Sequence, residues 1–254
     1  MDDLIFDINL NNSEYRLPYK GFGSIFAHVI NSIGLAQNLG FSKWNISIDK
    51  FNVFFDSLYY KNGIKVDGGD YFISVHKEIQ APIFSAHVPL NFNTFLKMTD
   101  IASQNFELKS SLNDFAMKKF ELLQKNNCFC AVHIRGTDKI TEINLPNEDE
   151  ILNTILLLLS KSKSDYCFVE TDDINFASML KNKNLPLIFD LDEISYLPKH
   201  FSSNNNLKRD IIHSRLLSMF EYFGYSFSNF SYMSLCLSKN KDMNFIPIYS
   251  DPYR

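Results

Sequence analysis

The chain has 254 residues, which is long enough for one large domain or two small ones. Hydrophobic residues make up 45% of it and charged residues 21%, as in ordinary globular proteins. The net charge of -4 excludes an overall positive field that would attract nucleic acid or an anionic membrane. An anionic ligand would therefore have to be held by local cations.

The cysteines and the N-terminus indicate a reducing compartment. The four cysteines lie in apolar settings and lack the spacing of a metal site. We expect them to be buried free thiols; they are Cys128, Cys130, Cys167 and Cys236. The start, MDDLIFDINL, is acidic where a signal peptide is basic, and the longest apolar run, Ile155–Leu159, is too short to span a bilayer. These features predict a soluble cytoplasmic protein.

The first half of the chain mixes strands and helices. After a glycine-rich turn, Ile25, Val29 and Ile33 recur at helical spacing on one stripe. The predicted elements are a strand at Leu4–Leu10, a helix within Gly21–Gly40, strands at Trp44–Ile48 and Tyr71–Val75, and helices at Asn93–Ala102 and Ser110–Gln124.

The second half alternates strands and helices more regularly. Its predicted strands are Cys128–Ile134, Tyr166–Glu170, Leu185–Asp190, Gly224–Phe227 and Phe245–Tyr249. Its predicted helices are Glu148–Ser160, Ile174–Lys181, Arg209–Tyr222 and Phe230–Leu237. This alternation is typical of a mostly parallel, doubly wound α/β sheet. We place a domain boundary near Lys125–Asn127, which divides the chain into domains 1–125 and 126–254.

Polar residues gather where the predicted strands of the second half end. The first strand runs into HIRGTDK, the second into Glu170–Asp173 and the third into Asp190–Asp192. The fourth runs into Ser228 and Asn229, which can cap a helix. Ligands of open α/β sheets bind at the carboxyl ends of strands, and helix N-termini bind anions. An arginine there, Arg135, would clamp a phosphate, so the pattern suggests a ligand that carries a pyrophosphate.

Each of these residues also has a purely structural interpretation. Arg135 can form an ion pair with Asp138 or Glu142, and His133 can be a buried histidine of the core. Asp172 and its neighbour Asp173 suit a helix N-cap and first turn, and Asp210 also lies at a predicted helix start. The glycines of the early turn and the serine–asparagine pair have similar structural alternatives.

Three blocks in order resemble one known family. GFGSIFAH (Gly21–His28) is similar to a glycine-rich turn with its helix histidine, and VHIRGTDK (Val132–Lys139) to a His-x-Arg-x-Thr-Asp-Lys signature. FVETDDINF (Phe168–Phe176) with the following Arg209–Ser231 is similar to the last conserved blocks. Together they resemble fucosyltransferases of the α1,6-fucosyltransferase and nodulation fucosyltransferase group, which are related to the α1,2- and protein O-fucosyltransferases.

The resemblance implies a GT-B-like fold: two Rossmann-like domains with parallel sheets and an interdomain cleft, the C-terminal one holding GDP-fucose. It implies inverting transfer of fucose to a glycan hydroxyl, with no metal and no cofactor besides the donor substrate. By position, the resemblance gives Arg135 the grip on the pyrophosphate and His133 a place beside it in the donor site. It gives Asp210 the recognition of the guanine or its flank, and Ser228 a contact to phosphate. Gly21, Gly23 and His28 would line the cleft from the N-terminal side, and we also expect Asp138, Asp172 and Asn229 to contact the substrate.

The chemistry of glycosyl transfer fits these roles. A departing diphosphate needs positive charge, which Arg135, a helix N-terminus and Lys139 can supply. The acceptor hydroxyl needs a base, which contributes on the order of 10²–10⁴ in rate. The family places a glutamate shortly after the signature lysine, which makes Glu142 the first candidate and Asp138 the fallback.

Two departures from the family pattern keep other functions open. Close relatives often carry a second arginine directly after the first, where this chain has Gly136, and Glu142 comes one residue early. A non-catalytic nucleotide- or sugar-binding relative is therefore one alternative. The other is a metal-dependent glycosyltransferase that uses Asp190-Leu191-Asp192 as an Asp-x-Asp motif for Mn²⁺ or Mg²⁺. The acceptor, the linkage and the oligomeric state do not follow from the sequence.

Overall fold

The computed structural model describes residues 5–9, 22–41, 43–47, 55–56, 89–136, 145–190 and 204–249. The predicted strand Tyr71–Val75 lies outside these ranges. None of the helices that they contain is long and apolar enough to cross a membrane.

The described residues of the N-terminal part form a parallel strand pair, a short antiparallel pair and three helices. Strand β1 (Ile5–Asn9) pairs in parallel with β2 (Lys43–Ser47), and helix α1 (Phe22–Asn38) connects them. The rest of this part, listed in chain order, is β3 (Phe55–Asp56), α2 (Phe92–Asn105), β4 (Glu107–Leu108) and α3 (Ser110–Lys125), with β3 and β4 antiparallel. The helices match the predicted ones to within a few residues.

The C-terminal part is built on a five-stranded parallel sheet in the order β7-β6-β5-β8-β9. Its strands are β5 (Cys130–Ile134), β6 (Cys167–Thr171), β7 (Leu187–Phe189), β8 (Tyr222–Tyr225) and β9 (Asn244–Pro247). Its helices are α4 (Glu148–Ser162), α5 (Ile174–Lys181), α6 (Asn204–Leu217) and α7 (Asn229–Cys236). The predicted doubly wound sheet is confirmed.

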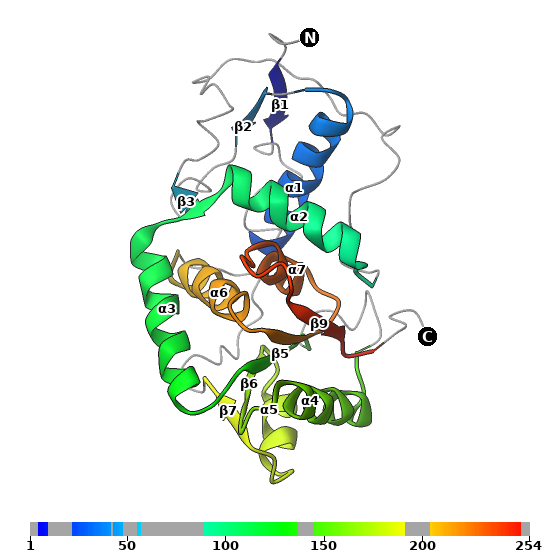
Figure 1. Ribbon diagram of the computed structural model, residues 1–254, viewed down its shortest axis with the longest axis vertical. Coiled ribbons are helices and arrows are strands. Elements are labelled where there is room, and N and C mark those ends of the chain that lie inside the picture. The colour runs from blue at the N-terminus through cyan, green and yellow to red at the C-terminus, as the bar shows by residue number, and fades with distance from the viewer. Residues whose placement is uncertain are drawn as a thin grey trace.

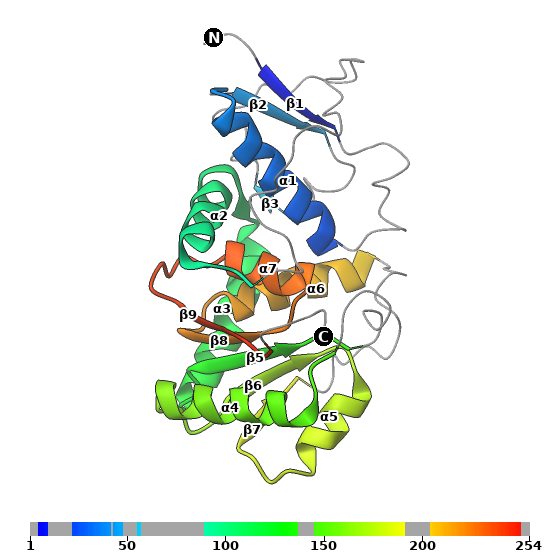
Figure 2. The same cartoon turned by 90° about the vertical axis from the view of Figure 1, so that its right-hand side faces the viewer.

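The helices cover the two faces of this sheet. Helices α4 and α5 lie on one face, and α6 and α7 lie on the other (Figures 1 and 2). The N-terminal helices pack against α6 and α7: α1 and α2 contact α7, and α3 contacts α6. The division of the chain into domains 1–125 and 126–254 falls in the turn between α3 and β5, and it stays a prediction.

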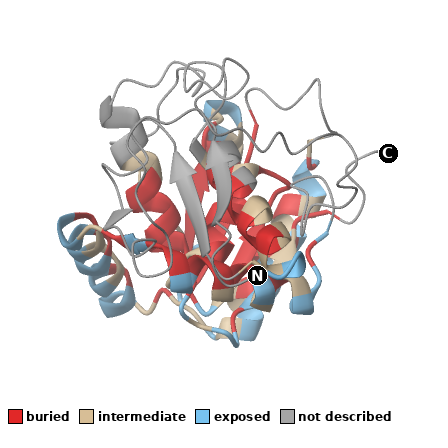
Figure 3. Ribbon diagram, turned by 90° about the horizontal axis from the view of Figure 1, so that it is seen from above, coloured by how far each residue is buried: buried red, intermediate tan, exposed pale blue. Residues whose placement is uncertain are grey.

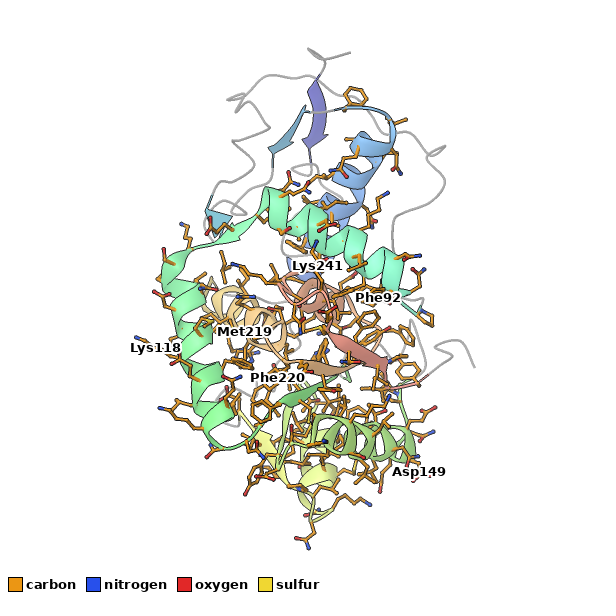
Figure 4. The ribbon with its side chains drawn as sticks, viewed as in Figure 1. Phe92, Lys118, Asp149, Met219, Phe220 and Lys241 are labelled. Carbon is orange, nitrogen blue, oxygen red and sulfur yellow. The ribbon has the colours of Figure 1, made fainter. Side chains whose placement is uncertain are left out.

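The core is continuous from the sheet into the helices on both faces. Buried residues occupy β5, β6, most of β8 and the inner sides of the helices, while exposed residues lie outside (Figure 3). Phe220 stacks on Phe168 with ring centroids 5.9 Å apart and meets Phe120 of α3 edge-on at 5.1 Å. Figure 4 shows Phe220 between α3 and the sheet, whereas Lys118 points away from the protein. These aromatic contacts attach α3 to the sheet.

The predicted helix Arg209–Tyr222 is displaced in the structure. Helix α6 begins at Asn204 and ends at Leu217, and Tyr222 already belongs to β8. The residues from Ser218 to Glu221 form a turn instead of a last helical turn, and the strand predicted at Gly224–Phe227 begins two residues earlier. Periodicity over so few residues does not settle this boundary.

The four cysteines are free and buried, as predicted. Burial raises the pKa of Cys128 to about 12 and raises that of Cys236. Cys130 and Cys167 are partners in the β5–β6 register. A hydrogen bond from Cys167 lowers the pKa of Cys130 to about 7 and correspondingly raises that of Cys167.

We expect native protein to resist a thiol-reactive dye such as DTNB at mildly alkaline pH, because all four thiols are buried and inaccessible to the dye. All four thiols should react once guanidinium unfolds the chain. If one thiol reacts slowly in the native state, Cys130→Ser should remove that phase. Rapid native reaction of any thiol would contradict the burial.

Candidate functional site

The order of the strands reverses at one point in the sheet. From β5 the chain proceeds through β6 and β7 on one side, and then crosses to β8 and β9 on the other side. The carboxyl ends of β5 and β8 therefore flank the point where the order reverses. Doubly wound sheets bind their ligands at such a point.

Arg135 lies at this point and is held there by two neighbours. Its backbone N–H donates to the Ser226 hydroxyl over 2.9 Å, and its Nη1 lies 3.0 Å from Asp172 Oδ2. The other oxygen of Asp172 accepts a hydrogen bond from Gly136 N–H at 2.8 Å. The Asp172 side chain is 1% exposed and that of Arg135 is 10% exposed. Asp172 thus fixes both the backbone and the guanidinium at the end of β5.

This ion pair does not prevent Arg135 from binding a ligand. A guanidinium has five N–H donors in a planar fork, so one arginine can hold a carboxylate and also an oxyanion. The predicted structural partners of Arg135, Asp138 and Glu142, lie outside the described residues. Within the described residues the partner is Asp172, from the end of the adjacent strand.

The N-terminus of α7 begins beside Arg135. Ser228 is its N-cap: the hydroxyl accepts from Ser231 N–H at 3.1 Å and donates to the Ser231 hydroxyl at 3.1 Å. The cap was predicted. The Ser228 hydroxyl is turned into the helix, and the residue is 2% exposed. An anion at this helix N-terminus would therefore contact the backbone N–H groups of the first helical turn.

His133 packs against the first turn of α7. Its Nδ1 lies 2.6 Å from the Ser231 hydroxyl, and its ring packs on Phe230 with centroids 4.6 Å apart. The imidazole is completely buried. His133 therefore fixes the first turn of α7, and its geometry matches the core interpretation of this residue more closely than direct donor contact.

Gly23 brings the N-terminal part of the chain to the same place. A Cβ atom on Gly23 would lie 2.9 Å from the carbonyl carbon and oxygen of Asn229 and 3.0 Å from Phe230 N. The α1 backbone thus touches the α7 backbone at its first turn, at a separation that only glycine permits. His28 also lies in α1.

A second polar cluster lies between α3, α6 and the ends of β6 and β7. His213 Nδ1 is 2.8 Å from Glu170 Oε2, and His213 Nε2 is 3.7 Å from Asp190 Oδ2. Lys119 of α3 forms an ion pair with the same Asp190 oxygen. Asp190, the first residue of the tentative Asp-x-Asp motif, is thus already paired, and Asp192 lies outside the described residues. Among the described residues no group of three or more His, Cys, Asp or Glu side chains is suited to hold a metal.

The structure brings six of the predicted site residues to one edge of the sheet: Gly23, His133, Arg135, Asp172, Ser228 and Asn229. Asp210 lies in the second turn of α6, where its Oδ1 is 3.6 Å from Arg209 Nη2, so it is not at a helix start as predicted. Gly21, Asp138, Lys139 and Glu142 lie outside the described residues.

Sequence reasoning missed two serines that build the site. Ser226 anchors the Arg135 backbone, and Ser231 links the cap to His133. The sequence carried a signal for each serine. Ser226 lies at a strand end, two residues before the predicted cap Ser228. Ser231 lies three residues after Ser228, at the position whose N–H a cap residue contacts. Neither signal identifies the partner on β5, which depends on the order of the strands.

Comparisons with known proteins identify the fold. No family model matches the chain, and no curated protein matches its sequence. It is similar to the solved structure of the fucosyltransferase NodZ from Bradyrhizobium, with a TM-score of 0.54 and 12% identity, over 94% of this chain and 94% of that one. NodZ α-1,6-fucosyltransferase co-crystallised with GDP gives 0.53 and 13%, over 94% and 93%.

POFUT1 in complex with GDP-fucose is a more distant match, with a TM-score of 0.41 and 11% identity. It covers 63% of this chain and 50% of that one, so this chain spans about half the length of POFUT1. At these identities the likeness to NodZ establishes the fold. The chain has an α/β, GT-B-like fold with a parallel sheet, shared with the NodZ fucosyltransferases, as the sequence predicted.

Proposed function

We propose that this protein is a glycosyltransferase that moves fucose from GDP-fucose to a glycan hydroxyl. The observation that carries the proposal is Arg135, fixed at the reversal point of the sheet beside the N-terminus of α7. An arginine fork next to a helix N-terminus suits the two phosphates of a nucleoside diphosphate. The fold shared with NodZ, one structure of which was co-crystallised with GDP, supports guanine as the base.

In the proposed reaction the acceptor oxygen attacks the anomeric carbon of fucose from the face opposite the diphosphate. The bond from that carbon to the β-phosphate oxygen breaks, its electron pair leaves with GDP, and the configuration inverts. Arg135, the α7 N-terminus and Lys139 stabilise the charge on the departing diphosphate. Glu142 takes the proton of the acceptor hydroxyl, with Asp138 as the fallback base.

The proposed reaction needs no metal ion. A helix N-terminus carries about half a positive charge. Together with the guanidinium of Arg135, it would stabilise the negative charge of the departing diphosphate, as a divalent cation does in metal-dependent glycosyltransferases. The pairing of Asp190 gives the Asp-x-Asp alternative less support, because Oδ2 of this carboxylate is already engaged by Lys119 and His213.

A thermal-shift panel of GDP, UDP, ADP and their sugars, with and without EDTA, tests this proposal. A ligand at one hundred times its dissociation constant stabilises the fold by about 2.7 kcal/mol. We expect GDP and GDP-fucose to raise the melting temperature, the uridine and adenine nucleotides to do so less, and EDTA to have no effect. Preference for a UDP-sugar or a strict Mn²⁺ requirement would contradict the proposal.

A non-catalytic binding relative is the second candidate, and the observation at Gly136 favours it. A Cβ on Gly136 would lie 2.4 Å from the Cβ of Asp173, so this position cannot carry a second arginine without rearrangement. Tight GDP binding with no transfer to any acceptor, and with no effect of Glu142→Gln, would identify that function instead.

A further inference from the structure

The end of β5 carries a glycine because a carboxylate lies directly over it. A Cβ on Gly136 would meet Asp173 Cβ at 2.4 Å, Oδ2 at 2.6 Å and Cγ at 2.9 Å. Real Cβ atoms do not approach other atoms so closely, and the contacting Cβ cannot rotate away. The glycine therefore lets Asp173 lie against the backbone next to Arg135.

Only one oxygen of this carboxylate has a role in the fold. Asp173 is the N-cap of α5, and its Oδ1 accepts from Asn175 N–H at 2.7 Å. Among the described residues the carboxylate makes no other hydrogen bond. The residue is half-buried, and Oδ2 lies over the backbone at the end of the strand.

Two carboxylates therefore lie close to Arg135, and they differ in their contacts. Asp172 is buried and paired with the guanidinium, whereas Asp173 adds a negative oxygen one residue further along. A carboxylate repels phosphate oxygens but accepts hydrogen bonds well from hydroxyl groups. The donors of a nucleotide sugar that suit Oδ2 are its hydroxyls and the N–H groups of its base, and the sugar hydroxyls lie nearest to the diphosphate that Arg135 would hold.

We infer that Asp173, through the space left by Gly136, accepts a hydrogen bond from a hydroxyl of the bound nucleotide sugar and so contributes to its recognition. This inference rests on the proposed function. The hydroxyl belongs either to the ribose or to the transferred sugar. These two cases predict that substitution of Asp173 lowers the affinity for different ligands.

The test measures dissociation constants of GDP, 2′-deoxy-GDP and GDP-fucose by calorimetry for wild type, Asp173→Asn and a control, Asp242→Asn. Asparagine caps helices as well as aspartate does, so α5 is kept. Asp242 is an exposed carboxylate at the opposite end of the sheet. We expect Asp173→Asn to weaken GDP-fucose about tenfold, the value of a hydrogen bond to a charged group, and the control to change nothing.

The pattern among the ligands assigns the hydroxyl. Weaker GDP-fucose with unchanged or tighter GDP identifies the transferred sugar. An equal loss for GDP and GDP-fucose, absent for 2′-deoxy-GDP, identifies the 2′-hydroxyl of the ribose, and an equal loss for all three ligands excludes the transferred sugar. Unchanged affinity for all three ligands overturns the inference and leaves the proposed function intact. If wild type binds none of them, the proposed function itself has failed.

A second set of variants tests the contact independently of any ligand. We expect Gly136→Ala to lower the melting temperature, Asp173→Gly to lower it slightly because glycine is a tolerated N-cap, and the double variant to recover most of the loss. Additive effects of the two substitutions would show that the side chains do not meet, which also overturns the inference.

Discussion

Arg135→Ala is expected to abolish measurable GDP binding. A charge-assisted, two-pronged contact from a guanidinium to a diphosphate is worth about 2–4 kcal/mol, which is on the order of 30- to 1,000-fold in affinity. Arg135→Lys should recover part of this loss, because it keeps the charge but loses the fork. Calorimetric titration with GDP measures both effects.

Arg135→Ala also lowers the stability of the fold, so a control variant must separate the loss of stability from the loss of GDP binding. Removing Arg135 leaves the Asp172 carboxylate, 1% exposed, without its cation, and breaking a buried pair costs about 3–5 kcal/mol. The double variant Arg135→Ala with Asp172→Asn removes that buried charge. It should regain thermal stability but still not bind GDP. Unchanged GDP affinity in this stable variant would show that Arg135 does not hold the donor.

Gly23→Val is expected to weaken both the fold and GDP binding. The new side chain would meet backbone atoms of Asn229 and Phe230 that cannot rotate away. Overpacking of this kind costs about 1–3 kcal/mol, or roughly 2–4 °C in melting temperature for each kcal/mol. Because relief requires α1 to move from the first turn of α7, GDP affinity should fall together with stability.

Gly40→Ala is the matched control. Gly40 has a φ of +84° and no atoms within 4 Å of an added Cβ, so alanine there meets only backbone strain. We expect a loss of stability of about 1–2 kcal/mol with GDP affinity unchanged. If Gly23→Val also leaves GDP affinity unchanged, the α7 N-terminus does not depend on its contact with α1.

Elements with local start signals were predictable from sequence. Helix α5 has the predicted bounds because Asp173 caps it, and α4 begins at the predicted Glu148 because Asn147 and Glu150 form a capping box. Both signals operate within a few residues of chain. The bounds of helix α6 were predicted five residues too late.

The site was predictable in position but not in its contacts. Parallel strands end at one edge, so the polar residues after β5, β6 and β8 had to lie near one another. Which of them pair depends on strand order and register. Arg135 pairs with Asp172 because β6 lies beside β5 with His133 opposite Glu170.

The sequence by itself determined the alternation of strands and helices, the buried thiols and the chemistry at the strand ends, because these follow from residue type and short-range spacing. Only the tertiary structure decided that His133 lies under the α7 cap, that Gly23 touches Asn229, and that Gly136 leaves room for Asp173. These are contacts between distant segments. They arise from close packing in three dimensions, where a single added carbon decides which backbones can meet.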